Sequence, residues 1–137
     1  MTCDVVKTDE LAKAEGKKLA EEAVKVLLEK LALDVCMYNV KEYTSITDYY
    51  VNATGRSATH VASLADDVAD NFALRGQSAL RIEGKKGNPW ILVDFGSLIV
   101  NVFDTEGRGF YNFDRLLPAE CKCDIAELVC AVDKKFE

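Results

Sequence analysis

Charged and hydrogen-bonding side chains alternate with apolar ones along three short segments in the second half of the chain. Arg81 and Glu83 flank an isoleucine, Trp90 and Asp94 bound an apolar run, and Asn101 lies between two valines. Successive side chains of a β-strand point to opposite faces of a sheet, so this alternation puts all five on one face. An earlier segment would add two more side chains to that face, Tyr50 and Asn52.

A tryptophan ringed by charged and amide groups has the composition of a protein–protein hot spot. A purely structural role fits the same pattern. In that interpretation Trp90 fills a gap beneath a loop, and Arg81 pairs with Glu83 or Asp94 only to neutralise charge. Spacing and composition leave both interpretations open.

The sequence offers little for catalysis. Gly96-Ser97 matches the turn that nucleotidyltransferases place before a pair of metal-binding aspartates, but segment 98–104 contains no such pair. A glycine-rich phosphate loop followed by Lys-Ser or Lys-Thr is absent, and the Asp-Phe-Gly at 94–96 matches a kinase motif only in letters. His60, the only histidine, has no nucleophile beside it. We therefore expect a protein that is not an enzyme and uses no cofactor or small-molecule substrate.

Bulk composition narrows the class of partner. The 137 residues suffice for one domain. The net charge of −6 works against binding a polyanion, so it favours a basic partner over a nucleic acid. The sequence has neither a membrane-length apolar run nor a signal-peptide pattern, which favours the cytoplasm. Five cysteines in such a chain are expected to be reduced thiols, and Cys121-x-Cys123 lacks the spacing of a zinc site.

Apolar periodicity predicts two amphipathic helices. The first begins at Thr8 and has an apolar face made of Leu19, Ala23, Val26, Leu27 and Leu31. The second follows Gly55-Arg56-Ser57, where Ser57 is a plausible N-cap, and ends at Gly76. Its apolar stripe consists of Val61, Leu64, Ala65, Val68 and Phe72.

Strands are predicted at 33–38, 48–54, 78–83, 89–95 and 98–103. Tight turns join the last three into an antiparallel meander, while the second strand, second helix and third strand form a crossover that joins parallel strands. The predicted fold is α/β (α+β), a mixed five-stranded sheet with its helices mainly on one face.

The C-terminal part is divided by Pro118. Before it, residues 110–117 read as a short helix or docking segment, and after it Ile125, Leu128, Val129 and Val132 could form a small helix. We therefore expect one domain over residues 1–118 and a C-terminal tail over 119–137 that contains this short helix.

The whole set of motifs resembles one known family. Residues 45–51 read Ser-Ile-Thr-Asp-Tyr-Tyr-Val, and Glu83-Gly84 and the run from Trp90 to Gly96 follow in order. This arrangement, over Thr8 to Pro118, is similar to that of the ribosomal silencing factor (Iojap) family, whose fold resembles that of nucleotidyltransferases. The chain departs from the family pattern at Ser97 and Asn101, where an Asp and a His are common, and at Leu117, where a Trp is frequent.

The resemblance implies a translational repressor that binds the large ribosomal subunit through ribosomal protein fourteen and sterically blocks joining of the small subunit. Action under nutrient shortage and a part in large-subunit biogenesis are further expectations. An exposed face of this kind could also form a homodimer when the protein is off the ribosome.

Specific roles follow for individual residues. We expect Trp90 to be a hydrophobic anchor, with Asp94 and Glu83 accepting hydrogen bonds from Lys or Arg of the partner. Arg81 and Asn101 would lie on the same face, and the neighbouring rim would be shaped by Thr47, Asp48 and Tyr49. A Trp90→Ala variant should fold but lose large-subunit binding.

Two other classes remain as alternatives. The first is a degenerate or active nucleotidyltransferase-like enzyme, which would bind nucleotide and divalent metal. The second is a direct ribosomal-RNA-binding module, favoured only by Lys85-Lys86 and exposed aromatic residues.

Overall fold

The computed structural model describes residues 10–135 and contains one mixed sheet of five strands. The strands are β1 (Leu33–Asn39), β2 (Tyr49–Gly55), β3 (Arg81–Glu83), β4 (Trp90–Asp94) and β5 (Leu98–Asp104), in the order β1-β2-β5-β4-β3. Only β2 and β5 pair in parallel. The predicted sheet and the β3-β4-β5 meander are confirmed. The crossover joins strands that run in the same direction, but β5 and β4 lie between them.

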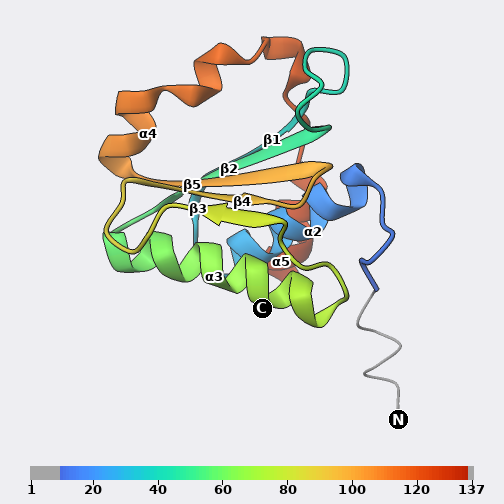
Figure 1. The fold of residues 1–137 in the computed structure, drawn as a ribbon, viewed down its shortest axis with the longest axis horizontal. Helices are drawn as coiled ribbons and strands as arrows, with labels where there is room; N and C mark the ends of the chain where they lie inside the picture. The colour runs from blue at the N-terminus through green and yellow to red at the C-terminus, as the bar shows by residue number, and fades with distance from the viewer. Residues whose placement is uncertain (1–9, 136–137) are drawn as a thin grey trace.

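Three helices lie on one face of this sheet (Figure 1). They are α2 (Gly16–Glu29), α3 (Ala58–Leu74) and α5 (Ala126–Lys135). The α3 stripe predicted from the sequence is confirmed in full, because all five of its residues are buried. Ser57 caps α3 by accepting a hydrogen bond from the His60 amide, 3.1 Å away. Between the helices and the sheet lies an apolar core that includes Val51, Val93 and Val102.

The first helix differs from its prediction at both ends. It begins at Gly16, whereas the predicted start, Thr8, lies outside the described residues. At the other end, Leu31 is not on the apolar face, since it is 62% exposed. Leu31 has a φ of 65° and follows the helix, and the amide of Ala32 bonds the carbonyl of Leu27 across it. Leu31 thus terminates the helix in the left-handed conformation that glycine usually supplies.

The third strand is shorter than predicted. It begins at Arg81 rather than Ser78, although the amide of Leu80 still bonds the carbonyl of Asp94. Beyond Asp94 the partner strand turns toward β5 through Gly96, whose φ is +95°. Residues 78–79 therefore have no adjacent strand with which to form backbone hydrogen bonds.

The opposite face of the sheet is covered by one continuous stretch, residues 105–121, which we call the covering segment. It consists of α4 (Thr105–Tyr111) and two 3-10 turns, η1 (Phe113–Leu116) and η2 (Ala119–Cys121), and it arches over the sheet from β5 toward β1 (Figure 1). A Cβ on Gly107 would lie 2.5 Å from the Pro89 carbonyl oxygen, so only glycine permits this approach of α4 to the start of β4.

The C-terminal residues are packed with the rest of the chain. Lys122 bridges Tyr38 of the edge strand β1, and the amide of Cys123 bonds the carbonyl of Met37 at 2.8 Å. Leu128 of α5 packs against the core beneath α2. The predicted terminal helix is present, and it extends the same packed body as residues 10–118.

Candidate partner-binding face

The sheet face under the covering segment is built from transverse rows of side chains, set by the strand register. One row runs from Arg81 through Asp94 and Ile99 to Tyr50 and Tyr38. The next row contains Glu83, Leu92, Asn101, Asn52 and Cys36. Trp90 belongs to a third row, beside Phe103. The predicted clustering of polar residues on one face is therefore present in the structure.

Trp90 is half-buried and forms the centre of an aromatic cluster. Its ring centroid lies 5.1 Å from that of Phe103, 5.0 Å from Tyr111 and 5.8 Å from Phe113. The indole Nε1 donates a hydrogen bond to Oδ1 of Asn101 at 3.0 Å. Trp90 thus helps to seat the covering segment, and an alanine there would disturb the fold as well as any contact with a partner.

A buried hydrogen-bond chain continues from Trp90 across the sheet. Asn101 donates to Oδ1 of Asn52 at 3.0 Å, and Asn52 donates to Oδ1 of Asp114 at 2.9 Å. Tyr38 also donates its hydroxyl hydrogen to that Asp114 oxygen at 2.9 Å. Both asparagines are 0% exposed, so they join the sheet to the covering segment and cannot touch a partner directly.

Arg108 closes this chain at the carboxylate of Asp114. Its Nε lies 2.7 Å from Oδ2, and the same guanidinium donates to Thr54 Oγ1 at 2.9 Å and to the Asp34 carbonyl at 3.0 Å. Burial acts to raise the pKa of Asp114, but hydrogen bonds from Arg108 and Asn52 outweigh it and hold that pKa below its ordinary value. Burial and the bond to Asp114 raise the pKa of the Tyr38 hydroxyl.

The β3–β4 margin remains outside the covering segment. There Arg81 bonds Glu83 (Nη1–Oε2 2.8 Å) and Asp94 (Nε–Oδ2 3.2 Å). The two carboxylates predicted to accept a partner's cation are therefore already paired with Arg81. More than half of the side-chain surface of Arg81 and of Glu83 is exposed, so water screens this pair strongly.

A hollow of about 240 Å³ borders this margin. Glu83, Trp90, Leu92 and Tyr111 are among the residues that line it. Acidic, apolar and aromatic groups thus meet at one open site, which is the part of the predicted face available to a partner.

Three of the predicted site residues lie elsewhere. Tyr49 is on the helix side of β2 and belongs to the apolar core, and Thr47 is buried with its hydroxyl bonded to the Tyr49 carbonyl at 3.4 Å. Asp48 is half-buried beside them. Tyr49 pairs with Leu98, whereas Trp90 pairs with Phe103 at the other end of β5. The structure therefore separates Thr47, Asp48 and Tyr49 from the tryptophan, and they do not form its rim.

The covering segment adds exposed apolar residues that strand alternation did not identify. Phe110 is 81% exposed and Leu116 75% exposed, and Tyr111 packs on Trp90. These residues come from a stretch predicted only as a short helix or docking segment. Their helical spacing gave no indication of the sheet face on which they lie.

The described residues carry few signs of other functions. No group of three or more His, Cys, Asp or Glu side chains within residues 10–135 is placed to hold a metal ion. Among the described helices, none is both long and apolar enough to cross a membrane.

Comparisons with known proteins agree on one family. The profile described as "Ribosomal silencing factor during starvation" matches residues 13–135, and so includes the tail that the sequence resemblance left out. A ribosomal silencing factor of Zymomonas mobilis is 35% identical over 85 residues, which are 62% of this chain and 64% of that protein. The chain thus spans less than two thirds of that relative's length.

A mouse protein named "Mitochondrial assembly of ribosomal large subunit protein 1" is 29% identical over 68% of this chain and 42% of its own length. Among solved structures, a crystal structure of a Chromobacterium violaceum protein superposes with a TM-score of 0.72 at 26% identity. It covers 74% of this chain and 85% of that one.

Proposed function

Because the chain belongs to the ribosomal silencing factor family, we propose that it represses translation by binding the large ribosomal subunit. The observation that carries this proposal is the family match over residues 13–135, which includes every element that builds the candidate face. The mechanism is steric. A folded body seated where the small subunit must join excludes it without covalent chemistry. We place this activity in the cytoplasm, the location favoured by the sequence, which has no signal-peptide pattern.

The partner is ribosomal protein fourteen of the large subunit, and the docking surface is the β3–β4 margin together with the exposed part of the covering segment. A net charge of −6 favours approach to a basic protein. At the margin, Glu83 can exchange Arg81 for a cation of the partner, because both side chains of the Arg81–Glu83 pair are more than half exposed. Asp94 lies beside it with 17% of its side chain exposed and is the less accessible acceptor. Phe110, Tyr111 and Leu116 supply apolar contact area beside them.

A role in assembly of the large subunit is a second function, supported by the name of the mouse relative. One docking surface serves both functions, because a factor that binds a finished large subunit can also bind a late precursor that already carries the same protein. A homodimer off the ribosome, through the same exposed apolar residues, remains a prediction.

Sedimentation of the protein with separated subunits tests the main proposal. We expect co-migration with the large particle alone, and fewer joined ribosomes when the small subunit is added. Unhindered joining at a saturating concentration of the protein would contradict the steric mechanism.

Two surface variants locate the docking site. Glu83→Arg reverses a charge at the margin, and Phe110→Ala removes an exposed ring, and each should weaken large-subunit binding roughly tenfold or more without loss of stability. Matched controls on the helix side are Asp70→Arg and Leu74→Ala, since Asp70 is exposed and Leu74 is 85% exposed on α3. If the test and control variants weaken binding equally, the docking surface is not at the β3–β4 margin.

A further inference from the structure

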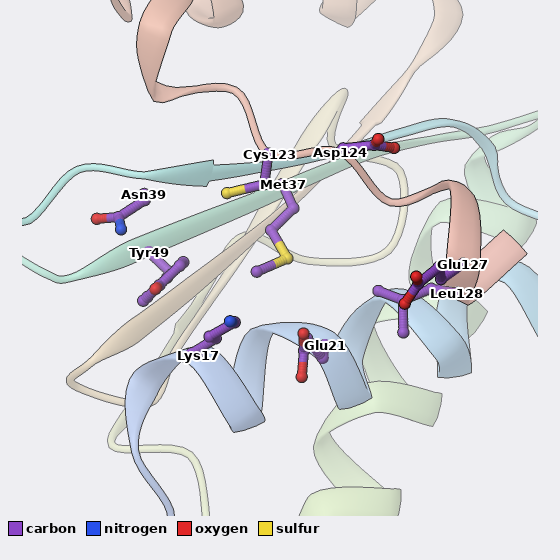
Figure 2. Close-up of a pocket in the computed structure, with 9 residues that line it drawn as sticks. All are labelled: Lys17, Glu21, Met37, Asn39, Tyr49, Cys123, Asp124, Glu127 and Leu128. Atoms are coloured by element: carbon purple, nitrogen blue, oxygen red, sulfur yellow. The ribbon is translucent and has the colours of Figure 1, made fainter.

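A hollow on the helix side of the sheet, far from Trp90 along the strands, is not used by the proposed function. It has a volume of about 500 Å³ and lies between α2, the paired ends of β1 and β2, and the segment that enters α5 (Figure 2). Lys17 and Glu21 come from α2, and Asp124 and Glu127 come from the C-terminal segment. This volume is within the range of small-molecule sites.

The side chain of Tyr49 brings a hydroxyl without a protein partner to this hollow. It is 4% exposed and lines the hollow, yet its hydroxyl has no hydrogen-bond partner among the described residues. No described side-chain oxygen or nitrogen is both shielded from solvent and unpaired, so the Tyr49 hydroxyl is accessible to solvent beside the hollow that Tyr49 lines. Such a hydroxyl can accept or donate a hydrogen bond to a ligand in the hollow.

The net negative charge of the lining residues favours a ligand with positive charge. Glu21, Asp124 and Glu127 give three carboxylates against one ammonium, that of Lys17. Within the described part of the chain, neither Glu21 nor Glu127 forms an ion pair, in contrast to Glu22 on the same helix, which binds Arg75 and Lys25. Lys41 does not line the hollow, but its Nζ lies 5.5 Å from the Tyr49 ring centroid, which shows that this ring can accept an ammonium group.

The apolar part of the lining fits an aliphatic chain. Met37 and Leu128 face the same hollow as the carboxylates, and Figure 2 shows Met37 between the strand residues and α2. Burial, and then the nearby Cys123 and Glu21 side chains, raise the pKa of the Tyr49 hydroxyl, so it stays uncharged at neutral pH.

We propose that this hollow binds a free aliphatic diamine or polyamine, with its ammonium groups on Glu21, Glu127 and the Tyr49 hydroxyl and its methylene chain on Met37 and Leu128. The binding is independent of ribosome docking, because the hollow and the β3–β4 margin are on opposite faces of the sheet.

Titration of the full chain with spermidine, followed by calorimetry and by backbone amide chemical shifts, tests the proposal. We expect saturable binding of one spermidine, with shifts at Glu21, Asn39 and Tyr49. Glu21→Gln and Glu127→Gln should each weaken binding about fivefold to tenfold, the scale of one partly screened charge pair. Asp66→Asn, the same charge change on the exposed side of α3, is the control and should have no effect.

Two further variants separate this site from its alternatives. Tyr49→Phe keeps the packed ring and removes only the unpaired hydroxyl, so it should fold normally and bind spermidine several-fold more weakly. Lys17→Gln removes the one ammonium among the residues that line the hollow and should tighten binding. Loss of binding in Lys17→Gln would mean an anion site and would overturn the proposal.

Absence of saturable binding, or equal weakening by Asp66→Asn and Glu21→Gln, would also overturn it. A parallel titration with the peptide acetyl-Gly-Lys-Gly-amide distinguishes a free amine from a lysine side chain of a protein. Tighter binding of the peptide than of spermidine would assign the hollow to a protein partner and reject the free amine.

Discussion

The two faces of the sheet are closed by different kinds of contact. On the helix side, α2 and α3 bury a continuous layer of apolar side chains, with Phe72 and Leu64 fully inside. On the other side, the covering segment is held by a chain of directional hydrogen bonds that ends in the Arg108–Asp114 pair. Burial is non-directional and tolerant, whereas a hydrogen-bonded network depends on each member. The helix side therefore supplies most of the stability, and the covered side fixes the shape of the surface offered to a partner.

The largest effect is expected in the apolar layer. Phe72→Ala removes a fully buried ring that stacks on Phe95 at 4.6 Å, and should cost about 3–5 kcal/mol of unfolding free energy. Urea denaturation followed by circular dichroism measures it. A loss below about 1 kcal/mol would show that the helix side is not the main source of stability.

The next largest effect is expected in the polar chain. Asp114→Ala leaves the Arg108 charge and the Asn52 amide without their partner, and should cost about 2–3 kcal/mol, somewhat less than a fully buried pair. Hydrogen exchange should show that residues 105–117 lose protection while α3 retains it. Uniform loss over both regions would mean that the two faces do not act separately.

Acid should weaken the covered face through Asp114. The pKa of Asp114 is lower in the folded state than in the unfolded chain, so its contribution is full above about pH 4 and is lost as the pH falls through the folded value. Glu22 on the helix side behaves in the same way. Between pH 6 and pH 3, the unfolding free energy measured by urea denaturation should therefore fall less in Asp114→Asn than in the wild type, although it should still fall. Identical profiles would refute the role of Asp114.

Trp90→Phe tests the link between the aromatic cluster and the asparagines. One aromatic ring is kept, while the Nε1 bond to Asn101 and the contacts of the five-membered ring are lost, so a cost of about 1–2 kcal/mol is expected. Thermal unfolding monitored by circular dichroism should show the shift, with large-subunit binding largely kept. Full loss of binding with unchanged stability would make the indole a direct partner contact.

The smallest effect is expected at the β3–β4 margin. Arg81→Gln removes two ion pairs whose cation is mostly exposed, and should change stability by less than about 1 kcal/mol. It should strengthen large-subunit binding, because Glu83 and Asp94 become available to the partner. A weakened complex would instead mean that Arg81 itself contacts the partner.

The sequence alone determined the local features of this protein. Helical spacing identified all five buried residues of α3, and period-2 alternation assigned Trp90, Asp94, Arg81 and Glu83 to one face. These predictions succeed because helix and strand geometry fix the direction of a side chain from its near neighbours. The ordered set of motifs also identified the family, which the match over residues 13–135 confirms.

Only the tertiary structure decided what covers each face. Asp114 bonds Asn52 across 62 positions of sequence and Tyr38 across 76, and no local pattern encodes such a partner. The same holds for Tyr49, whose assignment to the rim ignored that it faces the helices. Which segments meet depends on the order of strands in the sheet and on how the chain returns over it. These long-range contacts arise from the packing of the whole fold. For that reason, only the structure shows which polar residues of the face are buried and which are exposed.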